Sequence, residues 1–140
     1  MLLTRHTDYS LRFLMYLALN DARIVTIQEV AQTFKVPRNH LMKISQALAR
    51  HGYIHAIRGR GGGLRLAREP GDVNLRGVVS DMEPTLEIFD CHNPLCPIAG
   101  NCVLKKALME ARDHFLAALG KYTLADLVRH KSKLRRLLAT

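Results

Sequence analysis

The sequence predicts a mostly α-helical fold with one small β-hairpin, arranged as a winged helix-turn-helix domain followed by a long helix. Three observations predict this fold class. Apolar residues recur at helical spacing along most of the chain. Two short helical segments are joined by a tight turn, which is the helix-turn-helix pattern. A glycine-rich turn between two short apolar segments follows directly, and this is typical of a hairpin wing.

The first helix is indicated by apolar residues at the i, i+3, i+4, i+7 and i+8 positions: Leu11, Leu14, Met15, Ala18 and Leu19. We expect Thr7 or Asp8 to cap it, because short polar side chains accept hydrogen bonds from the N–H groups of a first helical turn.

A second and a third helix follow as the helix-turn-helix pair. Thr26 and Glu29 form a capping box that opens the second helix. Pro37 suits the first position of the third helix, which should end at Gly52. Four residues of this third helix are expected to face the core: Leu41, Ile44, Ala47 and Leu48.

The hairpin is predicted from Tyr53 to Leu66. Tyr53 to Ile57 forms the first strand, residues 58–63 (Arg-Gly-Arg-Gly-Gly-Gly) form the turn, and Leu64 to Leu66 form the return strand. Further on, Asn74 is expected to cap a short helix reaching Met82.

The last part of the chain contains a long amphipathic helix from Val103 to Leu119, and Thr123 is expected to cap a final helix running toward Leu138. We therefore divide the chain into a winged-helix DNA-binding domain (1–82), a cysteine-rich loop (83–102), and a long helix with a C-terminal helix (103–140).

The charge pattern favours a polyanionic partner for the N-terminal half. The net charge is +9, and residues 1–70 contain 11 Lys and Arg against 4 Asp and Glu. Residues 71–104 contain 1 against 5. The basic half suits double-stranded DNA, while the acidic middle segment does not suit a phosphate-binding surface.

The residues expected to contact DNA lie at the start of the third helix and in the hairpin turn. A recognition helix contacts base edges with its N-terminal residues. Arginine and lysine match guanine, and asparagine matches adenine. Glycines around the wing arginines let the backbone approach the minor groove. The expected contacts are Arg38, Asn39, His40, Lys43, Arg58 and Arg60.

Three cysteines, Cys91, Cys96 and Cys102, lie close together in a segment that also contains Pro94, Pro97 and Gly100. An odd number argues against a disulfide framework. Three soft thiolates suit zinc or an iron–sulfur cluster, and the absence of two C-x2–4-C pairs makes structural zinc less favoured. A fourth ligand is then needed, and the alternatives are Asp8, His6, His92, His114 or a small molecule.

Several sequence patterns resemble the winged-helix transcription regulator family that includes the iron–sulfur regulator IscR, and its nitric-oxide-sensing repressors in particular. The resemblance spans nearly the whole chain. It is carried by Thr7 to Arg12, Arg38-Asn39-His40, Lys43-Ile44, Gly52-Tyr53, residues 58–63, Glu83-Pro84, the three cysteines with Leu104-Lys105, and Tyr122 to Leu127.

The resemblance implies a homodimeric repressor of nitric-oxide stress genes. It implies a [4Fe–4S] cluster held by Cys91, Cys96 and Cys102, with [2Fe–2S] or zinc less favoured, and Val103 to Leu119 as the dimerisation helix. It also suggests a fourth ligand that is not a cysteine. We expect this ligand to be Asp8, and nitric oxide to release DNA by attacking the iron. The sequence leaves open which subunit supplies Asp8; if the other subunit does, the cluster ties the two subunits together.

Three alternatives remain: a winged-helix factor with structural zinc, the same fold with a cysteine-oxidation switch, and a thiol-dependent redox enzyme. The sequence contains no Ser/His/Asp set, nucleotide-binding glycine loop or paired carboxylates, so we do not expect an enzyme. No apolar stretch reaches the roughly 18 residues of a membrane span. We expect a cytoplasmic protein, where thiols stay reduced.

Overall fold

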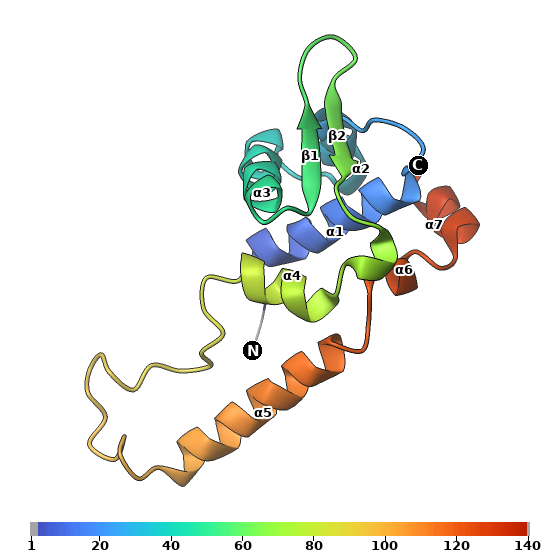
Figure 1. The fold of residues 1–140 in the computed structure, drawn as a ribbon. Helices are drawn as coiled ribbons and strands as arrows, with labels where there is room; N and C mark the ends of the chain where they lie inside the picture. The colour runs from blue at the N-terminus through green and yellow to red at the C-terminus, as the bar shows by residue number, and fades with distance from the viewer. Residues whose placement is uncertain (1–2, 140) are drawn as a thin grey trace.

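The computed structural model describes residues 3–139 and shows a helical body with a protruding hairpin and a long projecting helix (Figure 1). The elements follow in this order: α1 (Arg5–Leu19), α2 (Ile27–Phe34), α3 (Arg38–Arg50), β1 (Ile54–Ile57), β2 (Gly63–Leu66), a 3-10 turn η1 (Pro70–Asp72), α4 (Leu75–Met82), α5 (Val103–Leu119), α6 (Leu124–Leu127) and α7 (Lys131–Leu138). The winged-helix class predicted from the sequence is confirmed.

Helix α1 is the centre of the body, and it contacts α3, α4, α6, α7 and β2. Its Phe13 and Leu14 are fully buried, as are Ile44 and Leu48 of α3. The four α3 residues expected to face the core are all buried. Burying an apolar side chain stabilises the fold by about 1.5–3 kcal/mol, so this contact fixes α3 on α1.

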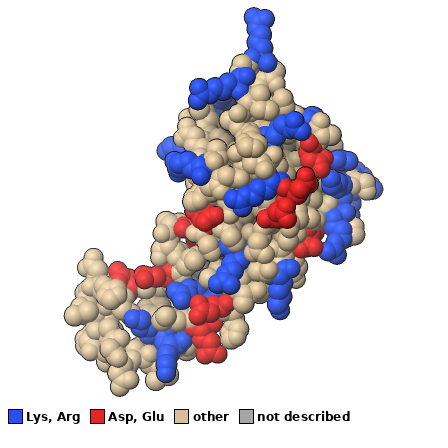
Figure 2. All heavy atoms as spheres, in the orientation of Figure 1, with Lys and Arg blue, Asp and Glu red and all other residues tan. Residues whose placement is uncertain are grey.

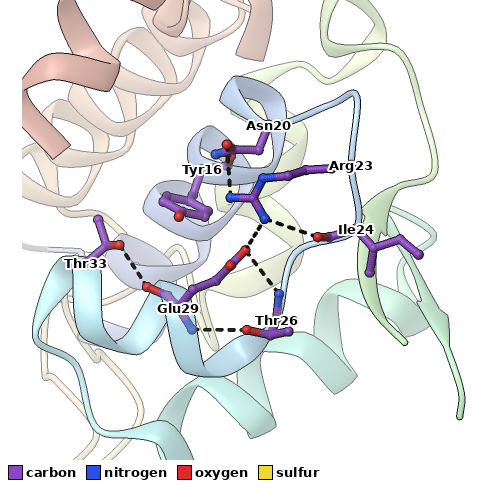
Figure 3. Close-up of polar contacts among 7 residues, drawn as sticks. All are labelled: Tyr16, Asn20, Arg23, Ile24, Thr26, Glu29 and Thr33. Atoms are coloured by element: carbon purple, nitrogen blue, oxygen red, sulfur yellow. Dashed lines mark hydrogen bonds and ion pairs between the residues drawn. The ribbon is translucent and has the colours of Figure 1, made fainter. Parts of the chain in front are cut away.

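The turn that joins α1 to α2 is held by one arginine. Arg23 donates hydrogen bonds to Glu29 (2.7 Å), to the Ile24 carbonyl (3.2 Å) and to Asn20 (3.2 Å), as Figure 3 shows. The capping box predicted for Thr26 and Glu29 is present. These contacts stack the start of α2 against the end of α1, and they set the angle at which the helix-turn-helix leaves the core.

The hairpin is antiparallel, with Ile54 opposite Leu66 and Ile57 opposite Gly63. Gly59 and Gly61 have positive φ angles of 96° and 70°, which glycine adopts without steric cost. The base of the hairpin is also bonded to the segment before α2, because Val25 and Leu64 exchange two backbone hydrogen bonds of 3.0 and 2.7 Å. The wing is therefore attached to the helix-turn-helix by the backbone.

The start of α1 differs from the sequence prediction. The N-cap is Thr4, whose hydroxyl accepts from the Thr7 N–H. The prediction of Thr7 or Asp8 was wrong, because apolar periodicity begins one turn later than the helix does. Thr7 is buried inside the helix and donates to Glu83, and Asp8 lies in the first turn.

The end of the chain also differs. Asn74 and Thr123 cap α4 and α6 as predicted. The single final helix is instead divided into α6 and α7, because Leu124 and Val128 enter the core and turn the chain. Arg135 then donates two hydrogen bonds, of 3.1 and 2.6 Å, to the Leu19 carbonyl at the end of α1.

Helix α5 projects from the body together with the loop before it (Figure 1). Its bounds, Val103 to Leu119, match the prediction. Leu116 is the only residue of this helix that is buried in the described structure, whereas Val103 and Leu104 are 79% and 66% exposed. Among residues 3–139, no helix is long and apolar enough to cross a membrane.

Candidate functional site

The first two turns of α3 present three polar side chains to solvent. Arg38, Asn39 and Lys43 are exposed, and Pro37 stands at the N-cap rather than inside the helix. The buried face of α3 holds these residues on the outer side, because an apolar stripe facing the core directs the opposite stripe outward. Their amide and cationic groups match the donor and acceptor pattern of base edges.

His40 is oriented differently from its neighbours in α3. It is half-buried, and its ring lies edge-on to Tyr9 (5.2 Å between centroids) and 6.3 Å from the His6 ring. Partial burial lowers the pKa of His6, the charges of His40 and Arg50 lower it further, and Glu83 opposes them. His40 thus joins the recognition helix to the first turns of α1, a contact that sequence reasoning did not find.

The wing carries a second set of cations. Arg58 and Arg60 are exposed in the hairpin turn, and Figure 2 shows basic side chains at the hairpin tip and around the upper part of the body. His55 and Arg65, which face each other across the two strands, are exposed as well. Sequence reasoning missed these two residues, although the alternation of strand side chains between two faces could have located them.

The cysteine loop joins α4 to α5 and contains three free cysteines. Cys91 is buried, and Cys96 and Cys102 are half-buried. The Cys96 N–H donates to the Cys91 carbonyl (3.0 Å), which bends the loop back on itself. Cys102 is the N-cap of α5, and its sulfur accepts from the Lys105 N–H at 3.3 Å.

The proposed metal ligands are not brought together in the described single chain. Within residues 3–139, no group of three or more His, Cys, Asp or Glu side chains is placed to hold a metal ion. Asp8 is instead held by Arg12, which donates to its two carboxylate oxygens at 2.9 and 3.0 Å. Figure 1 shows the loop extending away from the body that contains α1.

A small cavity of about 170 Å³ lies between the cysteine loop and α5. Its wall includes the Cys91 thiol, the apolar side chains Phe89 and Leu108, and the cations Lys105 and Arg112. Glu87 also lines this cavity, so its wall combines a thiol, apolar side chains and charges of both signs.

The start of the cysteine loop is fastened to α1 by Glu83. Its carboxylate accepts hydrogen bonds from the Thr4 N–H (3.0 Å), the Thr4 hydroxyl (2.9 Å) and the Thr7 hydroxyl. Partial burial acts to raise the pKa of Glu83, but the hydrogen bonds from Thr7 and Thr4 outweigh it and lower the pKa. The loop therefore leaves the body immediately beside the helix that carries Asp8.

An exposed recognition helix, a basic wing and a buried helical core define a winged-helix DNA-binding protein. Residues 3–130 match the family model described as "Rrf2: Iron-dependent Transcriptional regulator". The chain belongs to this family of transcription regulators, and the expectation that it is not an enzyme is confirmed.

The chain is 44% identical to the HTH-type transcriptional regulator NsrR of Bacillus subtilis (strain 168) over 99% of its own length and 97% of that protein. Two solved structures have the same fold at 21% identity. They are CymR (YrzC), the global cysteine regulator of B. subtilis (TM-score 0.78, covering 93% of this chain and 98% of that one), and IscR of T. potens (TM-score 0.76, covering 93% and 88%).

Proposed function

We propose that this regulator is a homodimeric repressor whose operator binding is controlled by a [4Fe–4S] cluster that reacts with nitric oxide. The observation that carries the proposal is the cysteine loop: three free cysteines within twelve residues, next to a helix that is almost wholly exposed. The similarity to a protein named NsrR and to a family described as iron-dependent supports the same function.

The donor set fits an iron–sulfur cluster. Cys91, Cys96 and Cys102 would hold it, since thiolates are the usual ligands of such clusters. The loop has few packed side chains, with Leu95 and Ile98 72% and 60% exposed, so it can adjust around a bound group. When bound, the cluster would supply iron that reacts with nitric oxide. A cytoplasmic location is part of this proposal, because thiols stay reduced there and remain available to a metal.

The homodimer is supported by the surface of α5. Val103, Leu104 and Met109 are exposed on a 17-residue helix that the body of the same chain leaves uncovered. Contiguous apolar surface of this kind is usually buried against a partner. A second copy, packed through α5, covers it in our proposal.

Asp8 would supply the fourth ligand from the other subunit. Among residues 3–139, the Asp8 carboxylate is hydrogen-bonded by the exposed Arg12, and such an ion pair contributes about 0–1 kcal/mol. This small contribution leaves the carboxylate free to move to a better partner. A ligand shared between subunits would fix the separation of the two recognition helices, which contact half-sites about 34–36 Å apart.

In the proposed dimer, each subunit presents its recognition helix and its wing to one half-site of the DNA. Arg38, Asn39 and Lys43 would enter the major groove from each subunit, and His40, packed against Tyr9, would hold the start of α3 beside them. Arg58 and Arg60 of each wing would contact the adjacent minor groove. Reversing the equilibrium between the DNA-binding and the non-binding arrangement of the dimer from 99:1 to 1:99 needs about 5.5 kcal/mol. A change in metal coordination can provide this, whereas an exposed ion pair cannot.

The test is an absorbance spectrum of anaerobically purified protein before and after nitric oxide, with iron, sulfide and operator-affinity measurements. We expect a broad visible band that bleaches, together with release of DNA. Asp8→Ala should keep the three-cysteine cluster but lose most of the nitric-oxide response. Asp21→Ala, which breaks the exposed ion pair with Lys131, serves as the control.

Other outcomes separate the alternatives. A colourless protein that contains stoichiometric zinc would indicate a structural zinc site instead of the cluster. DNA release on oxidation without iron would indicate a cysteine-oxidation switch. An unchanged response in Asp8→Ala would remove Asp8 from the ligand set.

A further inference from the structure

One hydrogen bond connects the wing to the helix that leads into the cysteine loop. The Tyr53 hydroxyl donates to a carboxylate oxygen of Asp81 at 2.5 Å. Tyr53 immediately precedes β1 and is 2% exposed, and Asp81 lies in the last turn of α4. Burial raises the pKa of Tyr53, and the Asp81 carboxylate raises it further, so this phenol stays protonated and donates.

The same tyrosine is fixed at the end of the recognition helix. The Arg68 guanidinium lies over the Tyr53 ring, 4.4 Å from its centroid. Arg68 also donates to the carbonyls of His51 (2.8 Å), the C-cap of α3, and of Gly52 (3.2 Å), which follows it. The Tyr53 carbonyl accepts from the Ala67 N–H at 2.9 Å. The end of α3 and both strands of the wing therefore meet at this ring.

The last turn of α4 has contacts on two sides. Asp81 bonds the wing base through Tyr53, and two residues later Glu83 bonds Thr4 and Thr7 at the start of α1. The cysteine loop begins directly after Glu83. A movement of the loop that shifts this turn must therefore move the wing, the first turn of α1, or both.

We infer that Tyr53 and Asp81 are positioning residues that transmit the state of the cysteine loop to the wing arginines. The inference rests on the proposed function, in which that loop changes state. The strands between Tyr53 and the wing tip are short and hydrogen-bonded, so a shift at the base moves Arg58 and Arg60. Carboxylate-to-hydroxyl hydrogen bonds are among the stronger ones in proteins, and this one makes the wing and α4 move together.

The experiment is a double-mutant cycle on operator affinity, carried out with the full-length protein in cluster-loaded and chelator-stripped forms. Tyr53→Phe removes the hydroxyl and keeps the buried ring and the Arg68 contact. Arg60→Ala removes a wing cation. Asp81→Asn is the second variant, and Tyr122→Phe, at an exposed tyrosine, is the matched control. Iron content, sulfide content and thermal melting are measured for every variant.

In the loaded protein we expect Tyr53→Phe to weaken operator binding about five- to tenfold at unchanged iron content, as loss of one charge-assisted hydrogen bond would. Arg60→Ala should then reduce operator affinity much less in the Tyr53→Phe background than in the wild type. In the stripped protein the two effects should add. Asp81→Asn should follow Tyr53→Phe, and Tyr122→Phe should match the wild type.

Full additivity in the loaded protein would overturn the inference, because the wing would then be placed independently of Tyr53. Equal non-additivity in both forms would also overturn it, because the wing would be coupled to α4 but not to the loop. Wild-type protein that binds the operator equally well with and without the cluster would instead remove the proposed function, which is a separate result.

Discussion

The helical body and the arm, which is formed by the cysteine loop and α5, differ in how much of their apolar surface one chain buries. In the body, Phe13, Val30 and Ile44 are 0% exposed, and every element contacts at least one other. In the arm, α5 buries Leu116 alone, and Leu95 and Val103 are 72% and 79% exposed. The body thus buries its apolar residues within one chain, whereas the arm leaves apolar residues exposed. If a second subunit covers the arm, as we propose, the residues that stabilise the fold are separate from those that regulate it.

The largest effect should come from the body. Ile44→Ala removes a fully buried side chain from the contact between α3 and α1, and we expect it to lower the free energy of unfolding by about 2–5 kcal/mol. Urea unfolding followed by circular dichroism measures this change. Leu95→Ala in the exposed loop is the control, and a similar loss there would contradict the comparison between body and arm.

The next effect concerns assembly rather than folding. Leu104→Asp places a charge on the exposed face of α5, where we propose that the second subunit packs. We expect the dimer to weaken at least tenfold, about 1.4 kcal/mol, while the melting of the body stays close to that of the wild type. Sedimentation velocity over a concentration series tests it. A variant that remains as dimeric as the wild type would place the interface elsewhere.

A smaller effect is expected where body and arm join. Glu83→Gln weakens the bonds to Thr4 and Thr7, and we expect a loss of about 1–2 kcal/mol at pH 7. The pKa of Glu83 is lowered in the folded protein, so its contribution is present above the unfolded value of about 4.3 and is lost as the pH falls through the lowered folded value. Unfolding curves from pH 7 to pH 3 should therefore converge for the two proteins. Curves that stay parallel would show that the carboxylate charge is not what stabilises the junction.

The smallest effect is expected at the exposed pair of Asp8 and Arg12. Arg12→Ala should change the free energy of unfolding by less than about 1 kcal/mol, because both side chains are more than 40% exposed. The informative measurement compares Arg12→Ala with Asp8→Ala for cluster content and nitric-oxide response. Equal behaviour of the two variants would show that Asp8 acts only through its ion pair with Arg12 on α1. A response lost only in Asp8→Ala would support its role as a ligand.

The sequence alone predicted most of the elements and most of their boundaries. The capping residues Thr26, Asn74 and Thr123 and the apolar spacing within α1, α3 and α5 are local signals, because capping and helical periodicity act over three or four residues. The cysteines and the wing arginines are likewise visible as composition within one short segment. The class of protein followed from these signals and their order.

Only the tertiary structure decided how distant residues are paired. Tyr53 and Asp81 are 28 positions apart, and Thr4 and Glu83 are 79 positions apart. The division of the last helix and the contact of His40 with α1 likewise depend on where the core lies. Hydrogen bonds between distant segments leave no periodic trace in a sequence, since their geometry exists only after the chain has packed. The helices and the hairpin of the body could thus be predicted from local sequence signals. The contacts that would link the cysteine loop to DNA were visible only in the packed structure.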